Sequence, residues 1–284
     1  MEKTYRIPEA ALFATPLPRE TKTYKPVSHR EIADTTLEAI HRAGFKLGKQ
    51  EYSAAVDGQM ANARYTIVDV ADSEMQLEIG WQNSYNKKLT LKFAIGTRIF
   101  ICQNGCVSGN LGAFKRKHTG DVVPFSHERI IEAIKGSADT FKEIQSQRDF
   151  MKTIEASKQV QAELLGRMYI EEDILKSTQL EIIKRELKTP TFDYGCPNSL
   201  WELYNHTTFA MKEVHPALWM DNHIRVHNFF NKYGILPPPG IEEIEVVEEE
   251  IVIESPTVDP AQVSILDEIE ERSVTRGSWT RERV

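Results

Sequence analysis

The sequence predicts an α+β fold with an N-terminal helix, an antiparallel β-meander of four or five strands, then a long helix and a C-terminal helical region. Three observations predict it. Apolar residues alternate with a period of two in the first half of the chain, they recur at helical spacing in the second half, and turn-forming residues separate the alternating runs. A chain of 284 residues that is 40% hydrophobic can bury a substantial core.

A first helix is predicted over residues 28–43. Ser28 and Glu31 have the spacing of a capping box, and apolar residues follow at roughly helical spacing until Gly44 ends the run. Residues 1–27 are expected to form an N-terminal extension. The domain itself is predicted to span residues 28–236.

The sheet is predicted over residues 45–111. In its clearest strand apolar residues share one face and polar residues lie on the other, with Met75, Leu77, Ile79 and Trp81 opposite Gln76, Glu78 and Gln82. The pattern continues in residues 65–68, 89–95 and 98–102, and turns rich in Asn, Asp, Ser and Gly separate these runs. This pattern predicts a meander with one buried face and one polar face.

The helical region is predicted over residues 126–235. It begins with one long helix, or with two that meet near Gly136 or Ala156. Further helices are predicted at about residues 171–188, 198–213 and 216–233. No stretch approaches the roughly 18 uninterrupted apolar residues that a membrane-spanning helix requires, so no membrane partner is expected.

The C-terminal residues are expected to form a disordered acidic tail. Folding is predicted to end near Leu236, and residues 237–284 begin with three prolines and a glycine, which is typical of a stiff linker. Residues 239–284 contain 13 Asp or Glu and four Arg, a net charge of −9. Because the whole chain has a net charge of −7, the preceding residues carry +2 and are nearly neutral.

The candidate functional site is a basic segment between Ile79 and Thr119, which contains no Asp or Glu. Its cations, predicted to contact phosphates, are Lys87, Lys88, Lys92, Arg98, Lys115, Arg116 and Lys117. Tyr85 and Phe114 are predicted to stack on unpaired bases. The alternative interpretation is a solvated basic surface, or a docking site for the chain's own acidic tail.

Cysteine and histidine residues provide weaker candidates. They are Cys102, Cys106 and Cys196, with His118, His223 and His227. Cys102 and Cys106 could form a zinc site with His118 or Cys196, and His223 and His227, one helical turn apart, could chelate a metal. Buried thiols and packed histidines fit the spacing better, so we predict no metal, no cofactor and no catalytic residue. An odd number of cysteines favours a reducing cytoplasm.

Two stretches resemble a known family. Residues 83–88 with 93–105 resemble its "NSYD…G.R.fvC.NG" signature, and residues 200–208 resemble its "lWdlyNa.T" segment. It is the phage- and plasmid-borne domain-of-unknown-function family numbered 932. In this chain Asn86 stands where members often carry Asp, and His206 where a small residue is common. The resemblance implies an origin in a mobile element, and thus a bacterial host cytoplasm, but no reaction.

The order of helix, meander and long helix is also similar to the core of phage single-strand annealing proteins, which act as rings or filaments. We therefore expect a non-enzymatic single-stranded DNA binding protein of phage or plasmid replication and recombination, able to form homo-oligomers. Its tail would recruit a replication or recombination protein, or compete with DNA for the basic segment. The alternatives are a protein-binding effector, such as an inhibitor of a host defence system, and a metal-dependent enzyme that uses Cys102 and Cys106.

Overall fold

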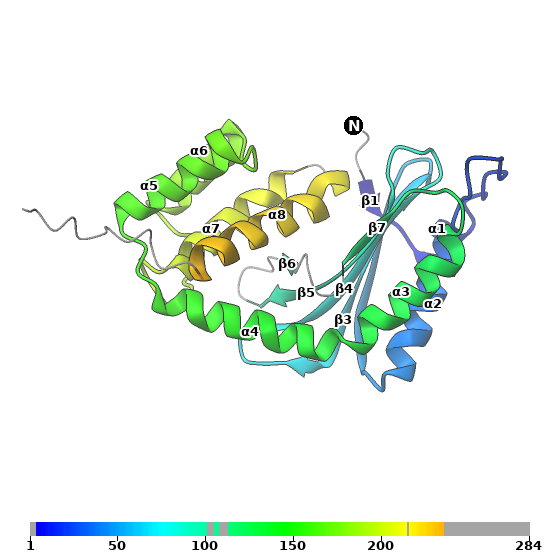
Figure 1. Ribbon diagram of the computed structural model, residues 1–284, viewed down its shortest axis with the longest axis horizontal. Helices are drawn as coiled ribbons and strands as arrows, with labels where there is room; N and C mark the ends of the chain where they lie inside the picture. Colours follow the sequence, from blue (N-terminus) through cyan, green and yellow to red (C-terminus); the bar gives the residue numbers. More distant parts are fainter. Residues whose placement is uncertain (1–3, 101–104, 108–112, 215, 236–284) are drawn as a thin grey trace, which may run out of the picture. The chain divides into compact units, whose positions relative to one another are not determined.

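The computed structural model describes residues 4–100, 105–107, 113–214 and 216–235, and within them it has an α+β fold (Figure 1). All described residues belong to one compact unit of the chain, Met1–Pro239. The predicted linker and acidic tail, residues 237–284, lie outside the described residues, as does Cys102.

The described residues form a seven-stranded antiparallel sheet in which β1 to β6 follow one another in sequence order and β7 pairs with β5. The strands are β1 (Thr4–Arg6), β2 (Leu47–Ala55), β3 (Met60–Ala71), β4 (Met75–Ser84), β5 (Leu91–Ile99), β6 (Gly105–Val107) and β7 (Phe114–Arg116). The predicted meander is confirmed, with more strands than expected. Gly96 does not end a strand as predicted, because β5 continues through it and pairs with Glu78 of β4.

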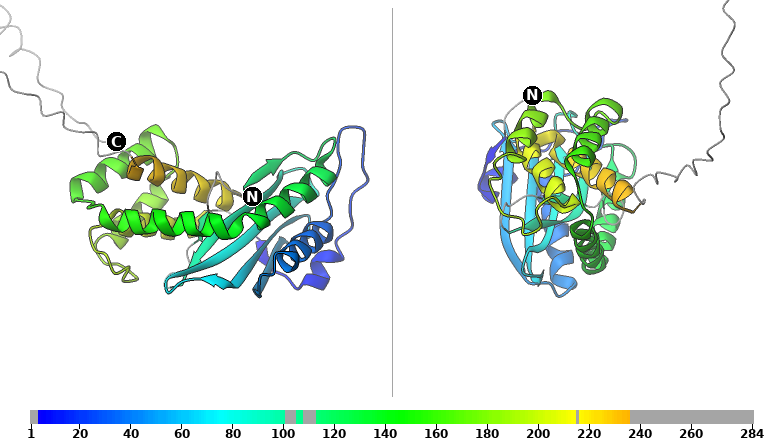
Figure 2. Two further views of the ribbon diagram at one scale, coloured as in Figure 1. Left: turned by 60° about the horizontal axis from the view of Figure 1, so that its bottom comes forward. Right: turned by 90° about the vertical axis from the view of Figure 1, so that its left-hand side faces the viewer.

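The helices of the described residues are α1 (Glu9–Phe13), α2 (His29–Arg42), α3 (Val122–Lys135), α4 (Ser137–Thr153), α5 (Lys158–Gly166), α6 (Ser177–Glu186), α7 (Leu200–Ala210) and α8 (Pro216–Ile235). Gly136 separates α3 from α4, which follow one another along one face of the sheet with a change of direction between them (Figure 2). The first predicted helix is confirmed as α2, although the Ser28 side chain does not cap it. Gly44 ends that helix in a left-handed conformation, φ 75°.

Residues 4–27, predicted to precede the domain, are part of it. β1 pairs with β2, and the side chains of Leu12 and Val27 are completely buried in the main core. These contacts join residues that are far apart in the sequence, so no local pattern could indicate them.

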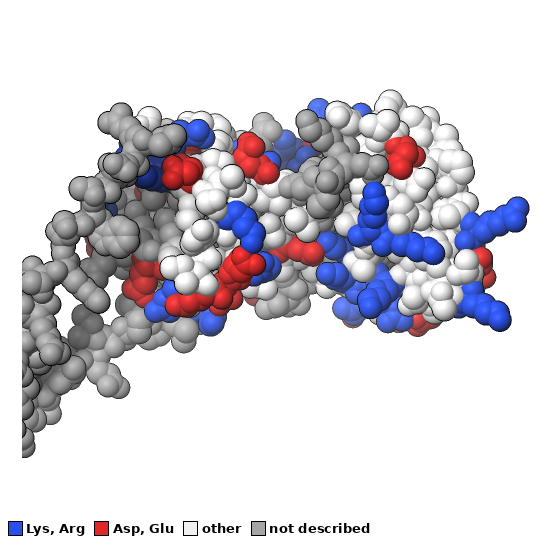
Figure 3. All heavy atoms as spheres, turned by 90° about the horizontal axis from the view of Figure 1, so that it is seen from above, with Lys and Arg blue, Asp and Glu red and all other residues white. Residues whose placement is uncertain are grey.

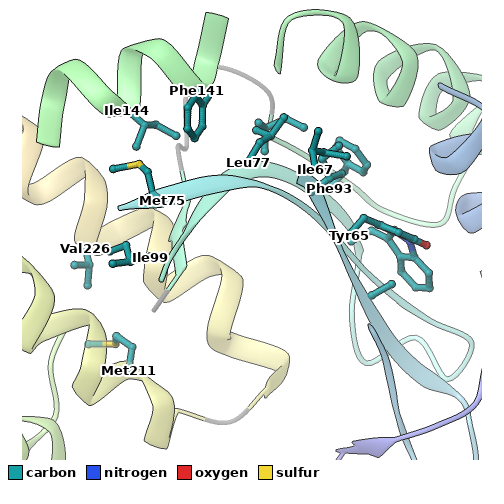
Figure 4. Packing of buried hydrophobic residues seen from close by; sticks show 14 of the residues in the cluster. Tyr65, Ile67, Met75, Leu77, Phe93, Ile99, Phe141, Ile144, Met211 and Val226 are labelled. Carbon is teal, nitrogen blue, oxygen red and sulfur yellow. The ribbon is translucent and has the colours of Figure 1, made fainter. Parts of the chain in front are cut away.

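The core lies between the apolar face of the sheet and the helices α2, α3 and α4. Met75, Leu77, Ile79 and Trp81 are completely buried, as the alternation predicts. Figure 4 shows Phe141 and Ile144 of α4 over Met75 and Leu77, whereas α8 lies on the other side of the strands with Val226 beside Ile99.

The polar face of the sheet is not solvated as the sequence predicted, because α8 covers part of it. Met220 of α8 packs against Ala94 of β5. Glu78 and Gln82 of β4 are therefore only 6% and 3% exposed. Polar alternation reports which residues share a face, but not whether a distant helix will cover that face.

Asp72 ties the β3–β4 turn to α4. Its carboxylate accepts hydrogen bonds from the backbone N–H groups of Glu74 and Met75, both at 2.8 Å, and from the side chains of Gln145 and Arg148. Burial alone would raise the pKa of Asp72, but these hydrogen bonds lower it to about 2. The folded state therefore prefers the ionised carboxylate.

Asp72→Ala is expected to lower the free energy of unfolding by about 2 kcal/mol, because it removes the acceptor for four donors, including the 7%-exposed Arg148. The measurement is urea unfolding at pH 7. Glu132→Ala is the control, since it removes a solvent-exposed ion pair with Arg129 and should change stability by less than about 0.5 kcal/mol. Equal effects of the two substitutions would contradict the tethering role of Asp72.

Candidate nucleic-acid interface

The fold brings five of the seven predicted cations to one end of the sheet. Lys87 and Lys88 lie in the turn between β4 and β5, and Lys115 and Arg116 belong to β7. β7 pairs with the beginning of β5, where Leu91 faces Arg116. The turn and β7, 27 positions apart in sequence between Lys88 and Lys115, therefore lie at the same end of the sheet, together with Lys117.

The turn that carries Lys87 and Lys88 is held by side-chain hydrogen bonds. Ser84 Oγ accepts from the Leu89 N–H at 3.0 Å and donates to the Leu89 carbonyl at 2.9 Å. Asn86 Oδ1 accepts from the Lys88 N–H at 3.1 Å, and Lys87 adopts a left-handed conformation, φ 63°. A lysine held in this conformation presents its side chain from a fixed turn rather than from a flexible loop.

The N-terminal segment contributes further cations that the sequence analysis missed. The Lys25 N–H donates to the His118 carbonyl at 2.8 Å, and the Tyr24 hydroxyl donates to the Tyr85 carbonyl at 2.9 Å. These contacts place the segment beside the turn, where Lys87 Nζ lies 4.7 Å from the centre of the Tyr24 ring. No periodicity or motif links residues separated by about 60 positions in the sequence, so no local signal predicts this contact.

We call the resulting surface the basic end. It consists of Lys22, Lys25, Lys87, Lys88, Lys115, Arg116 and Lys117. Figure 3 shows Lys and Arg side chains gathered over one half of this view, and more Asp and Glu over the other half. Lys25, Lys115 and Arg116 form ion pairs with Glu20, Asp221 and Asp121. The fold therefore gathers seven cations from three segments at this end of the sheet.

Lys92 and Arg98 do not belong to the basic end, contrary to the prediction. Lys92 is 5% exposed, and its Nζ donates to Asp221 Oδ2 of α8 at 2.7 Å. Arg98 Nη1 lies 3.7 Å from Glu51 Oε2, in a cluster where Glu51 also pairs with Arg6, Lys49 and Arg64. Neither side chain is placed to contact a phosphate at the basic end.

Tyr85 does not present a free ring face for base stacking, which corrects the prediction for this residue, whereas Phe114 is half-buried. Tyr85 is 6% exposed, and its ring stacks on His29 with 3.9 Å between the ring centres. Phe114 packs against Phe93 at 5.6 Å and Phe125 at 5.8 Å. The Tyr85 ring therefore supports the surface from beneath instead of forming part of it.

His29 and Asn83 hold the backbone under the basic end. Asn83 Nδ2 donates to the Val27 carbonyl at 2.8 Å and to His29 Nδ1 at 3.0 Å, and His29 Nε2 donates to the Gly58 carbonyl at 3.1 Å. Burial lowers the pKa of His29 to about 4, so the ring is neutral near pH 7. This arrangement is a structural network with no open side for a substrate.

Among the described residues no group of three or more His, Cys, Asp or Glu side chains is placed to bind a metal ion. His223 and His227 are each 1% exposed, and burial lowers the pKa of His227 to about 4. Cys196 is a free cysteine. No helix in the described part of the chain is both long and apolar enough to cross a membrane.

Comparison with known proteins identifies one relationship in this chain. The family model described as "Domain of unknown function (DUF932)" matches residues 16–225. The match includes β2 to β7, α2 to α7 and the whole basic end. No curated protein and no solved structure matches the chain.

Proposed function

The chain belongs to the family described as Domain of unknown function (DUF932), and we propose that it binds single-stranded DNA without enzymatic activity, in the replication or recombination of a phage or plasmid. The observation that carries the proposal is the basic end. Three segments that are distant in sequence contribute seven cations there, from a turn, a short strand and the N-terminal segment.

The chemistry of the basic end suits phosphate contacts rather than reading of sequence. Lysine side chains neutralise phosphates and release counterions, which supplies affinity without base recognition. The cations lie at irregular positions on a turn, a short strand and a loop. A flexible single strand can follow such positions, whereas a duplex presents its phosphates at fixed spacing.

In this proposal the acidic residues 239–284, with a net charge of −9, have one of two tasks. They compete with DNA for the basic end as a tethered polyanion, or they recruit a replication or recombination protein. Deletion of residues 240–284 separates these tasks, because only competition predicts that DNA affinity rises on deletion.

Binding of a labelled single-stranded oligonucleotide is expected to weaken steeply between about 50 and 200 mM salt. If four to seven phosphates are neutralised, log K against log salt should have a slope of roughly −3 to −5. A duplex of the same length is the control and should bind more weakly. Absence of binding at 50 mM salt would overturn the proposal and favour a protein partner, and tighter duplex binding would overturn the strand preference.

A further inference from the structure

A cleft of about 240 Å³ lies between the sheet and the beginning of α8. Its floor is the polar face of β3 and β4, and α8 forms one wall. Among the residues that line the cleft are Asn62, Arg64, Gly80, Gln82, Trp219 and Met220. This space is small for a drug-sized ligand but sufficient for one planar ring system.

A row of polar side chains connects this cleft to the basic end. Each member is the direct cross-strand neighbour of the next, in the order Ser53, Asn62, Gln82, Lys92, Lys115. Gln82 and Lys115 are two strands apart, roughly 10 Å at the usual strand spacing. Asp221, which follows Met220 on α8, lies 2.7 Å from Lys92 and 3.7 Å from Lys115. The cleft and the basic end therefore lie on the same face of the sheet, with Asp221 of α8 between them.

The lining of the cleft combines a flat aromatic ring with amide groups. The Trp219 ring lies 4.5 Å from the His223 ring and 5.8 Å from the Arg64 guanidinium. Asn62 and Gln82 each carry a carboxamide, which has both donor and acceptor atoms. Gly80 leaves the floor open, since a Cβ there would point toward Met220 Cε at 3.6 Å. Planar rings with donors and acceptors on one edge, such as nucleobases, fit this combination.

A buried carboxylate provides an independent observation. A second hollow of about 10 Å³ shares Arg64, Gly80 and Trp219 with the cleft, and Glu78 lines it. Glu78 Oε2 is buried and has no hydrogen-bond partner among the described residues. Burial raises the pKa of Glu78, although Arg64 and Arg98 oppose this effect. A buried hydrogen-bond acceptor without a partner raises the free energy of the folded protein. The hollow is therefore suited to one small hydrogen-bond donor group.

We propose that the cleft is a base pocket, which binds one unstacked base of the strand whose phosphates contact the basic end. The exocyclic amino group of adenine, cytosine or guanine donates to Glu78, and thymine, which lacks that group, binds more weakly. The inference rests on the proposed function. It also gives the protein a way to select unpaired DNA, since a duplex cannot insert a base into the pocket.

The test uses the full chain and two oligonucleotides with the same number of phosphates, one of deoxycytidine and one abasic. The wild-type protein is expected to bind the deoxycytidine strand roughly 10-fold more tightly, with similar salt slopes for both strands. Gly80→Val, which fills the floor of the pocket, should bind the two strands equally well. Asn62→Leu is the second variant if Gly80→Val fails to fold.

Three outcomes separate the inference from the proposed function. Equal wild-type affinity for both strands, with a steep salt slope, would overturn the base pocket and leave DNA binding at the basic end intact. No binding of either strand at low salt would overturn both. If deoxycytidine and thymidine strands bind equally well, or if Glu78→Gln leaves their ratio unchanged, the role of Glu78 is wrong.

Discussion

Reversing three charges at the basic end, with Lys87→Glu, Lys88→Glu and Lys117→Glu together, is expected to weaken single-stranded DNA binding by at least 100-fold at about 100 mM salt. All three side chains are exposed. Loss of three phosphate contacts should also reduce the magnitude of the salt slope by about 2. Both quantities come from the same salt titration, so the slope identifies the loss as electrostatic. Lys92 is excluded from the set because Lys92→Glu would place a buried carboxylate beside that of Asp221.

The matched control reverses three exposed lysines on α5, on α6 and just after α6, with Lys158→Glu, Lys184→Glu and Lys188→Glu. Both α5 and α6 lie at the opposite end of the described fold from β7 (Figure 1). This variant has the same net charge as the first, but we expect its affinity to remain within about threefold of the wild type, since distant charges are screened by salt. Equal losses in both variants would mean that net charge, not the basic end, determines binding. Retained affinity in the first variant would overturn the proposed function.

The sequence predicts the buried face of the sheet because alternation is a local property. Met75, Leu77, Ile79 and Trp81 follow the period of two and are all completely buried. The same period continued past Trp81 assigns Asn83 and Tyr85 to the buried side, where the structure places them. That signal was available in the sequence and argues against Tyr85 as an exposed stacking residue.

The remaining differences depend on contacts between distant segments. Lys92 has the spacing of an exposed strand residue, but α8 covers it. Asp221 of α8, which lies 129 positions later in the sequence, pairs with Lys92 there. Trp219 and Glu78 likewise line adjacent hollows only because α8 crosses the polar face of the sheet. Charge counting therefore predicts that a basic surface exists, and the docking of α8 determines which cations belong to it.

Acidification is expected to destabilise the fold, because two buried histidines are neutral in the folded chain. Lowering the pH from 7.5 to 5.0 is expected to reduce the free energy of unfolding by about 4 kcal/mol, of which His29 and His227 each contribute about 2 kcal/mol. Burial lowers the pKa of both residues from 6.5 to about 4. Between these two values the unfolded chain binds protons that the folded chain does not. Stability is therefore fully present above pH 6.5 and is lost as the pH falls toward 4.

The measurement is urea unfolding at several pH values between 5.0 and 6.5, where two histidines should give an average slope of about 2 kcal/mol per pH unit. His227→Gln should halve this slope whatever its effect on total stability, whereas His41→Gln, at an exposed position, should leave it unchanged. Burial raises the pKa of Glu78, which acts in the opposite direction, so the difference between variant and wild type is the decisive quantity. If the slope of His227→Gln equals that of the wild type, His227 is protonated in the folded chain and its burial is not as described.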